Sequence, residues 1–318
     1  MPDGDRVFLT GASGFVGSHV LRELLDSGYG VRALVRSSSV QPPQPFDDRA
    51  ERIEGDLRST GGFARALAGC RYLVHCAALY SFAPGDRGQI RAVNVDATAS
   101  LLAAARLAGV ERVVLTSSSA TLGHAEGAYH RSKAEQELAA FAGRVPVVAL
   151  LPTAPVGPGD WKPTPTGRLV LDFARGKVAA RAPGEGGMNL VPVEDVARVH
   201  VTALRDGRAG ERYVLGGENL TMDEIWQMLA DVTGRPMPAW RAPYALAFAA
   251  GCVDEVRCRV QRGAVPAVPL EGVRLSRVRM FADSAPARAA LAHAPGPLRD
   301  ALARAVAWYR ANGYVAAA

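Results

Sequence analysis

Short apolar runs alternate along the first half of the chain with longer stretches in which apolar residues recur every three or four positions. The runs are 7–10, 31–35, 72–76, 113–116 and 145–151, and the stretches between them are rich in Ala and Leu. Strands that alternate with helices build right-handed βαβ units. The pattern therefore predicts an α/β fold, a Rossmann-type doubly wound parallel sheet with helices on both faces.

The pattern changes after residue 151. Pro and Gly become so dense over 152–167 that we expect neither a regular helix nor a strand there. Two later runs, 189–193 and 212–215, read as strands. Thr221 and Glu224 form a capping box that opens another helix, and 298–309 is a last helix. The second half therefore differs from the first and is the expected substrate region.

A glycine-rich turn follows the first apolar run: Gly11-Ala12-Ser13-Gly14-Phe15-Val16-Gly17. It leads into the helical pattern of Val20, Leu21 and Leu24. In such a strand, turn and helix, glycines permit a tight turn, close approach to a pyrophosphate and close packing, and the helix N-terminus offers N–H groups to the anion. The spacing is one residue longer than G-x-G-x-x-G, so this turn alone also fits one that binds no ligand.

A second motif lies about a hundred residues later, where Ser117-Ser118 is followed by Tyr129-x-x-x-Lys133. Reduction of a ketone by hydride needs a proton for the developing alkoxide, and a Tyr with a pKa near 10 carries one at neutral pH. Lys133 lies one helical turn further on, where its ammonium would favour the phenolate. A Tyr and a Lys at this spacing in isolation are more often a surface pair.

The motifs together resemble the extended short-chain dehydrogenase/reductases, over nearly the whole chain. The resemblance is strongest with the dihydroflavonol-4-reductase-like branch, in particular with bacterial hopanoid-associated sugar epimerases. The matching segments are 7–17, 54–58, 116–118, 129–133, 162–168 and 213–221. The resemblance implies a dinucleotide-binding domain over 1–155 with returning segments near 189–217, and a partly discontinuous substrate region over 156–188 and 218–318.

The resemblance also assigns site residues. Ser118 would hydrogen-bond the substrate oxygen beside Tyr129 and Lys133, with Ser117, Ser119 and Thr121 as neighbours, and Asn94 would lie in the helix beneath the site. Lys133 would also hold the ribose. The other residues assigned to the cofactor are Gly11, Ser13, Gly14, Phe15, Val16, Gly17, Arg36, Asp56, Leu57, Ala77, Ala78, Pro152 and Thr153.

The end of the second strand bears on the choice of cofactor. NAD-binding proteins usually place an Asp or Glu there for the ribose hydroxyls, whereas this chain has Val35-Arg36-Ser37-Ser38. The planar fork of Arg36 suits a 2′-phosphate. We therefore predict NADP(H), with NAD(H) as the other possibility.

The segment between Ser118 and Tyr129 is shorter than in most extended members of the resembled family. We expect an open active site and a substrate that is larger or flatter than a compact sugar. His124, Glu126 and His130 would be candidates for a proton relay, although isolated loop residues of these types are more often solvated.

Composition limits the partners. The 318 residues carry a formal net charge of +6 without the Lys/Arg runs of a nucleic-acid surface, so no nucleic-acid partner is expected. The four cysteines form no C-x-x-C pair and the start has no signal-peptide pattern, which favours reduced thiols in the cytoplasm. No apolar run reaches membrane-spanning length. The longest candidate, 242–253, is expected to be a buried helix or a substrate wall, with an interfacial helix as the alternative. The resemblance further implies a homodimer through helices near 92–108 and 129–141.

These features predict an NADP(H)-dependent ketoreductase or alcohol dehydrogenase acting on a bulky or hydrophobic small molecule through Ser118, Tyr129 and Lys133. The alternative is an NAD-dependent nucleotide-sugar epimerase. A non-catalytic NADP sensor is disfavoured because such proteins generally lose the Tyr and Lys. A dehydratase is disfavoured because Ser119 and Ala120 stand where that class carries an Asp-Glu pair. No metal site is expected.

Overall fold

The computed structural model describes residues 5–36, 46–59, 63–80, 86–123, 128–181, 185–261, 267–268 and 270–315. Its larger sheet has seven parallel strands in the order β3-β2-β1-β4-β5-β6-β9. These are β1 (Arg6–Thr10), β2 (Gly30–Val35), β3 (Glu51–Glu54), β4 (Tyr72–His75), β5 (Arg112–Thr116), β6 (Val147–Pro152) and β9 (Arg212–Leu215). The predicted doubly wound parallel sheet is confirmed.

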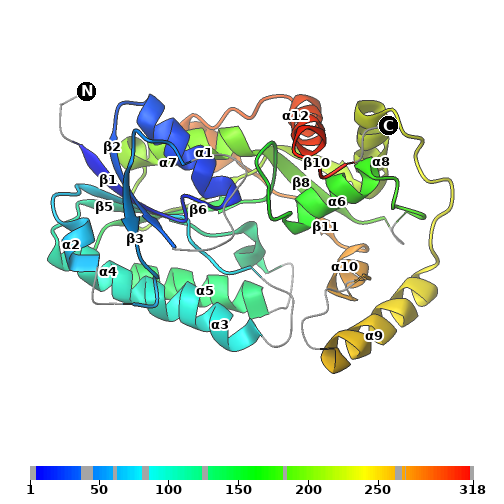
Figure 1. Ribbon diagram of the computed structural model, residues 1–318, viewed down its shortest axis with the longest axis horizontal. Helices are drawn as coiled ribbons and strands as arrows, with labels where there is room; N and C mark the ends of the chain where they lie inside the picture. Colours follow the sequence, from blue (N-terminus) through cyan, green and yellow to red (C-terminus); the bar gives the residue numbers. More distant parts are fainter. Residues whose placement is uncertain are drawn as a thin grey trace.

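Helices cover both faces of this sheet (Figure 1). On one face α1 (Phe15–Asp26) packs along α7 (Val193–Asp206). The other face carries α2 (Phe63–Leu67), α3 (Arg87–Arg91), α4 (Ala97–Leu107) and α5 (Ala128–Ala142). All six residues of β6 are buried, as expected for a parallel strand enclosed by helices. The sheet thus separates two hydrophobic cores, one on each side.

A smaller sheet lies beyond the carboxyl ends of the large one (Figure 1). Its central strand β8 (Gly187–Pro192) pairs with β10 (Glu218–Thr221), β11 (Arg279–Met280) and β7 (Ala154–Val156). A third core packs α6 (Pro165–Ala174), α8 (Met222–Thr233) and α12 (Leu298–Ala311) against it. The predicted capping box is present at Thr221 and Glu224. The remaining helices are α9 (Tyr244–Val260), α10 (Leu270–Leu275) and α11 (Ala285–Leu291).

Two sequence expectations are wrong. Regular structure does occur within 152–167, since β7 runs from Ala154 to Val156 and α6 begins at Pro165. β7 pairs with β8 alone, so Pro155 sits on an edge strand, where a missing N–H is tolerated, and a Pro in the first helical turn loses no bond. The apolar stretch 242–253 is not buried either, because α9 exposes much of it.

Among the described residues, none of the helices has the length and apolar character that crossing a bilayer requires.

Candidate active site

The glycine-rich turn joins β1 to α1 at the carboxyl edge of the large sheet. Gly11 has a φ of +79°, and a Cβ there would lie 2.6 Å from the backbone nitrogen of Ala77 at the end of β4. A Cβ on Gly17 would lie 2.0 Å from the carbonyl oxygen of Gly11. Both positions therefore require glycine. Gly11 needs it for its positive φ and for its close approach to Ala77, and Gly17 needs it so that α1 can pack against the turn.

The first turn of α1 is suited to an anion. Gly14 is the N-cap residue and supplies no side-chain cap, and no acidic side chain lies in the first turn. The backbone N–H groups of Phe15, Val16 and Gly17 thus meet no competing carboxylate from the first turn of α1 itself. This arrangement fits the pyrophosphate of a dinucleotide. Trp161 lies against the same turn and donates from Nε1 to the carbonyl oxygen of Ser13 at 3.0 Å.

Among the described residues where β2 and β3 end, Glu54 is paired with Arg52, which leaves two further cations, Arg36 and Arg58, and one further carboxylate, Asp56. Arg36 follows β2 and is exposed. Asp56 accepts from the guanidinium of Arg58 at 2.6 Å, and this pair holds the pKa of Asp56 at about 2, with a smaller contribution from Arg36. Because Arg58 engages the carboxylate, the local charge at this edge is positive. Leu57 is buried beneath it.

Ser118 and Tyr129 meet although eleven positions separate them. Ser118 caps a 3₁₀ turn, Ser119–Leu122, directly after β5, and its Oγ accepts from the backbone nitrogen of Ala120 at 3.2 Å. Tyr129 stands in the first turn of α5, and its phenol lies close enough to Ser118 for that hydroxyl to lower the pKa of the phenol. Burial raises the pKa of Tyr129 to about 12 and the Ser118 contact opposes that rise. The phenol therefore keeps its proton at neutral pH.

Lys133 is fully buried one turn along α5. Its Nζ donates to the carbonyl oxygen of Thr116 at 2.7 Å and to Oε1 of Gln136, so in this structure the ammonium turns to the end of β5. Burial lowers the pKa of Lys133 to about 8, against the opposing charge of Glu137. Gln136 in turn donates from Nε2 to Thr98 at 2.9 Å. The cation thus belongs to a hydrogen-bonded buried network.

A neutral histidine completes this network. His75, at the end of β4, contacts Thr10 at 2.6 Å and Thr98 at 2.8 Å. Burial first, and the Lys133 charge second, lower the pKa of His75 to about 3. The histidine is therefore uncharged at neutral pH and leaves Lys133 as the cation of the pair.

A second group of side chains fixes the 3₁₀ turn that presents Ser118. Glu137 is buried, and its Oε1 accepts from Ser117 and, at 2.9 Å, from Thr121. Arg212, at the start of β9, pairs with the other oxygen of Glu137 at 2.8 Å and also donates to Thr121 at 2.8 Å. We name Glu137, Arg212, Ser117 and Thr121 the serine-turn clamp.

The remaining assigned residues surround this centre. Ala77 and Ala78 follow β4, and Pro152 ends β6. Thr153 donates to Oδ1 of Asn189 at 2.9 Å, which ties the end of β6 to the small sheet. Asn94 is buried beneath α5 and donates to Ser132 at 3.0 Å.

Of the three proton-relay candidates, His130 lies beside Tyr129 with ring centroids 5.8 Å apart, whereas His124 and Glu126 lie outside the described residues. Sequence reasoning missed Gln136, Glu137, Arg212 and Tyr80. The first two lie three and four residues after Lys133, on the same face of the helix, where polar residues could have signalled a buried role. Arg212 carries no such signal, because only the tertiary fold brings it to α5.

Residues 7–216 match the model of the NAD dependent epimerase/dehydratase family. The chain belongs to this family. Its members include extended short-chain dehydrogenase/reductases, and the family implies an NAD(P)-dependent oxidoreductase acting on a small molecule.

Relatives of known name extend over the whole chain. A provisionally named dihydroflavonol 4-reductase of Synechocystis is 38% identical, over 98% of this chain and 96% of its own. Sterol demethylase protein B of Methylococcus capsulatus is 36% identical, over 96% and 99%. The crystal structure of gox2253 superposes with a TM-score of 0.83 at 35% identity, over 98% of this chain and 100% of its own.

Proposed function

We propose that this protein is an NADP(H)-dependent carbonyl reductase of a bulky, lipophilic small molecule. The observation that carries the proposal is the juxtaposition of Ser118, after β5, and Tyr129, in the first turn of α5, at the carboxyl edge of the sheet. It joins a hydroxyl that can bind a carbonyl oxygen to a phenol that holds its proton at neutral pH.

Each residue of the site has a separate role in the reduction. When bound, the nicotinamide supplies the hydride that reaches the carbonyl carbon. Ser118 hydrogen-bonds the carbonyl oxygen and orients it, and Tyr129 delivers the phenolic proton to that oxygen as negative charge develops there. Lys133 lies one turn further along the same helix, and its ammonium would favour the phenolate that remains once it turns from Thr116 toward the phenol. A Tyr129 pKa of about 12 keeps the phenol protonated at neutral pH, as its role as the acid requires.

Three features of the chain would hold the dinucleotide. The turn from Gly11 to Gly17 and the first turn of α1 would bind the pyrophosphate. Arg36, beside the neutralised Asp56, would bind a 2′-phosphate through its guanidinium. This positive local charge supports NADP(H) over NAD(H), which lacks that phosphate.

The substrate class is inferred from the surroundings of Tyr129 and from the relatives. The ring of Tyr80, which is 42% exposed, lies with its centroid 4.3 Å from that of Tyr129 and supplies an apolar wall beside the phenol. The names of two relatives point to a dihydroflavonol and a sterol. Flat, polycyclic ketones are therefore the class to test first.

The experiment is an NADPH-oxidation assay with a panel of a keto-sterol, a dihydroflavonol and small aliphatic ketones, run beside an epimerisation assay with UDP-glucose. We expect NADPH-dependent turnover that rises with the apolar area of the ketone and disappears in Tyr129→Phe. Tyr80→Phe is the matched control, because it removes a neighbouring hydroxyl and keeps both rings. Epimerisation with tightly retained NAD and no ketone turnover would replace the proposal with a nucleotide-sugar epimerase.

We also propose a homodimer through α4 and α5. These helices pack side by side and form an open groove of about 340 Å³, lined mainly by small residues (Ala99, Ala103, Ala139, Ala142 and Gly143) together with Leu102, Arg106 and Arg144. Small side chains of this kind permit close approach of a second helix pair. Light scattering should give twice the chain mass of 33.5 kDa, and a monomeric mass would refute the dimer.

A further inference from the structure

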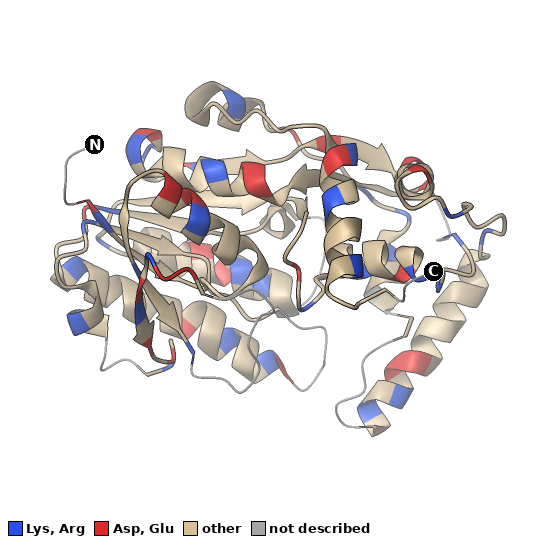
Figure 2. Ribbon diagram, turned by 45° about the horizontal axis from the view of Figure 1, so that its top comes forward, with Lys and Arg blue, Asp and Glu red and all other residues tan. Residues whose placement is uncertain are grey.

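Residues 158–164 form the greater part of the loop between β7 and α6, and they overlap the segment 162–168 that carries the resemblance of the sequence. This loop lies between α1, which follows the glycine-rich turn, and α12, which packs against the smaller sheet (Figure 1 and Figure 2). The loop makes hydrogen bonds on both sides. We name residues 158–164 the turn strap.

On one side the turn strap contacts the glycine-rich turn and α1. The indole Nε1 of Trp161 donates to the carbonyl oxygen of Ser13 at 3.0 Å. His19, buried in the second turn of α1, donates from Nε2 to the carbonyl oxygen of Pro158 at 2.9 Å. The ammonium of Lys162 lies 4.4 Å from the centroid of the Trp161 ring and holds one face of the indole. The indole is thus fixed both by its N–H group and by its face.

The bond to Ser13 acts on the peptide that directly precedes α1. The nitrogen of this peptide belongs to Gly14, the N-cap residue, and donates to the carbonyl oxygen of Gly11 at 2.9 Å. Glycine has no side chain to restrict rotation of this peptide, and a carbonyl oxygen that turned toward the first turn of α1 would repel an anion there. Because Trp161 binds the carbonyl and Gly11 binds the N–H, the peptide is fixed at both ends.

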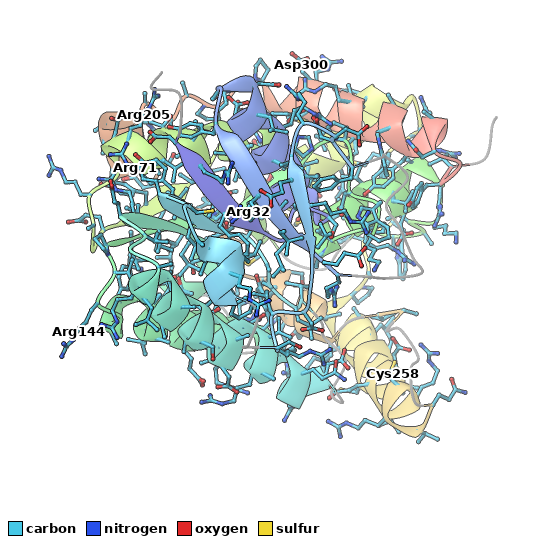
Figure 3. All side chains as sticks on the ribbon, turned by 60° about the vertical axis from the view of Figure 1, so that its left-hand side comes forward. Arg32, Arg71, Arg144, Arg205, Cys258 and Asp300 are labelled. Carbon is cyan, nitrogen blue, oxygen red and sulfur yellow. The ribbon has the colours of Figure 1, made fainter. Side chains whose placement is uncertain are left out.

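On the other side the turn strap contacts the carboxyl-terminal segment. Tyr314 lies three residues after α12, and its hydroxyl donates to the carbonyl oxygen of Trp161 at 2.7 Å. The carbonyl oxygen of Tyr314 accepts from Nε of Arg175, just after α6, at 2.6 Å. Figure 3, in which Asp300 marks the first turn of α12, shows this helix on the same side of the molecule as α1. The carboxyl-terminal segment therefore reaches the glycine-rich turn through Trp161.

A buried carboxylate fixes the path of the turn strap. Asp160 is 2% exposed, and its Oδ2 accepts from the backbone nitrogen and the hydroxyl of Thr164 at 2.8 and 2.7 Å and from the hydroxyl of Tyr309 at 3.4 Å. Its Oδ1 meets no donor within the described part of the chain, and burial raises the pKa of Asp160 to about 6. Burying a carboxylate costs free energy that a plain connection from β7 to α6 would not require.

We propose that Trp161 is a positioning residue for the dinucleotide, and that the turn strap couples the packing of the carboxyl-terminal segment to cofactor affinity. By fixing the Ser13 carbonyl, Trp161 presets the N–H groups of the first turn of α1 for a pyrophosphate, which then binds without the cost of ordering the turn. The inference rests on the part of the proposed function that puts the pyrophosphate at this turn, and it is independent of the ketone. NADP(H) and NAD(H) share the pyrophosphate, so the turn strap contributes equally to the binding of both.

The test is the dissociation constant of NADPH and of NADH for wild type and Trp161→Phe, measured by nicotinamide fluorescence at pH 7.5. Phenylalanine keeps an aromatic ring and removes the N–H group. We expect both constants to rise about three- to tenfold and by the same factor, which is the effect of one lost hydrogen bond. Unchanged constants, or a rise for one dinucleotide alone, would overturn the proposal. Wild type that binds neither dinucleotide would refute the proposed function as well.

A second variant tests the coupling to the carboxyl-terminal segment. Tyr314→Phe removes the donor to the Trp161 carbonyl, and we expect both dissociation constants to rise about two- to fivefold. The double variant Trp161→Phe/Tyr314→Phe should bind about as well as Trp161→Phe alone, because Tyr314 acts through Trp161. No effect of Tyr314→Phe, or a double-variant loss equal to the product of the two single losses, would contradict the coupling.

Trp226→Phe is the matched control, because it makes the same substitution away from the turn strap. Trp226 on α8 is 5% exposed and stacks on Phe173, and its Nε1 has no acceptor among the residues that the structure describes. Thermal unfolding of every variant separates folding from binding. We expect Trp226→Phe to bind both dinucleotides like wild type even where its Tm falls. Equal weakening of binding in Trp226→Phe and Trp161→Phe would assign the effect to general destabilisation and overturn the positioning role.

Discussion

Raising the pH through the pKa of Lys133 should reduce the rate of ketone reduction. Burial lowers that pKa from 10.5 to about 8, so about one-tenth of the ammonium remains at pH 9 and about one-hundredth at pH 10. An ordinary lysine would keep nearly all of its charge at pH 9. We therefore expect kcat/KM for NADPH, which follows ionisation of the free enzyme, to fall about tenfold per pH unit above 8.

The same shift makes a prediction about stability that needs no activity. Since the folded pKa of Lys133 is the lower one, the unfolded chain binds more protons between pH 8 and 10.5, and this group increases stability as the pH rises through that window. The full effect is about 3 kcal/mol for a shift of this size. Urea unfolding of wild type and Lys133→Met at pH 7.5 and 10 isolates the contribution of Lys133 to the free energy of unfolding, because the variant lacks the titrating amine.

The two measurements test one premise from two directions. A kcat/KM that stays flat to pH 10, together with a wild-type-minus-variant difference in unfolding free energy that does not change with pH, would show that Lys133 is not a buried cation of lowered pKa. The reasoning from its burial and its contacts to Thr116 and Gln136 would then be wrong.

The remaining predictions concern the centre, the cofactor and the serine-turn clamp. Tyr129→Phe should lower kcat about 10²- to 10⁴-fold with KM for NADPH little changed, measured by steady-state kinetics; retained turnover would exclude Tyr129 as the acid. Arg36→Ala should raise KM for NADPH at least about tenfold and leave that for NADH nearly constant, because only NADPH loses a charge-assisted hydrogen bond, and no change would argue against NADP(H). Glu137→Gln should lower kcat about tenfold without altering NADPH affinity, since it loosens the turn that presents Ser118; unchanged kcat would limit the clamp to stability.

Much of the fold could be predicted because it depends on local pattern. Buried parallel strands read as continuous apolar runs, so β1, β2, β4, β5 and β6 were found to within a few residues of their bounds. The turn at Gly11 could also be predicted from local sequence. Its positive φ and the proximity of Ala77 allow only a glycine there, and the sequence shows that glycine directly.

The sequence predictions fail where contacts between elements distant in the chain determine the structure. Pro155 disfavoured a strand because it lacks a backbone N–H, yet β7 forms backbone hydrogen bonds along one edge only, where the missing N–H is tolerated. The apolar run of α9 indicated burial, but a sequence does not say which face its neighbours cover, and α9 docks through its opposite side. The partners of Glu137 come from the segment after β5 and from β9, which lie far apart in the chain, so no spacing rule joins them.

The central claim is that hydride passes from NADPH to a ketone while Tyr129 supplies the proton. The most direct test uses NADPH deuterated at the nicotinamide C4 on each face in turn, with a polycyclic ketone, and mass spectrometry of the product. The account predicts an alcohol that gains one deuterium from one of the two faces in wild type, and at least about a hundredfold less labelled alcohol in the same time with Tyr129→Phe. Equal labelled product from wild type and Tyr129→Phe, or product without label from either face, would contradict it.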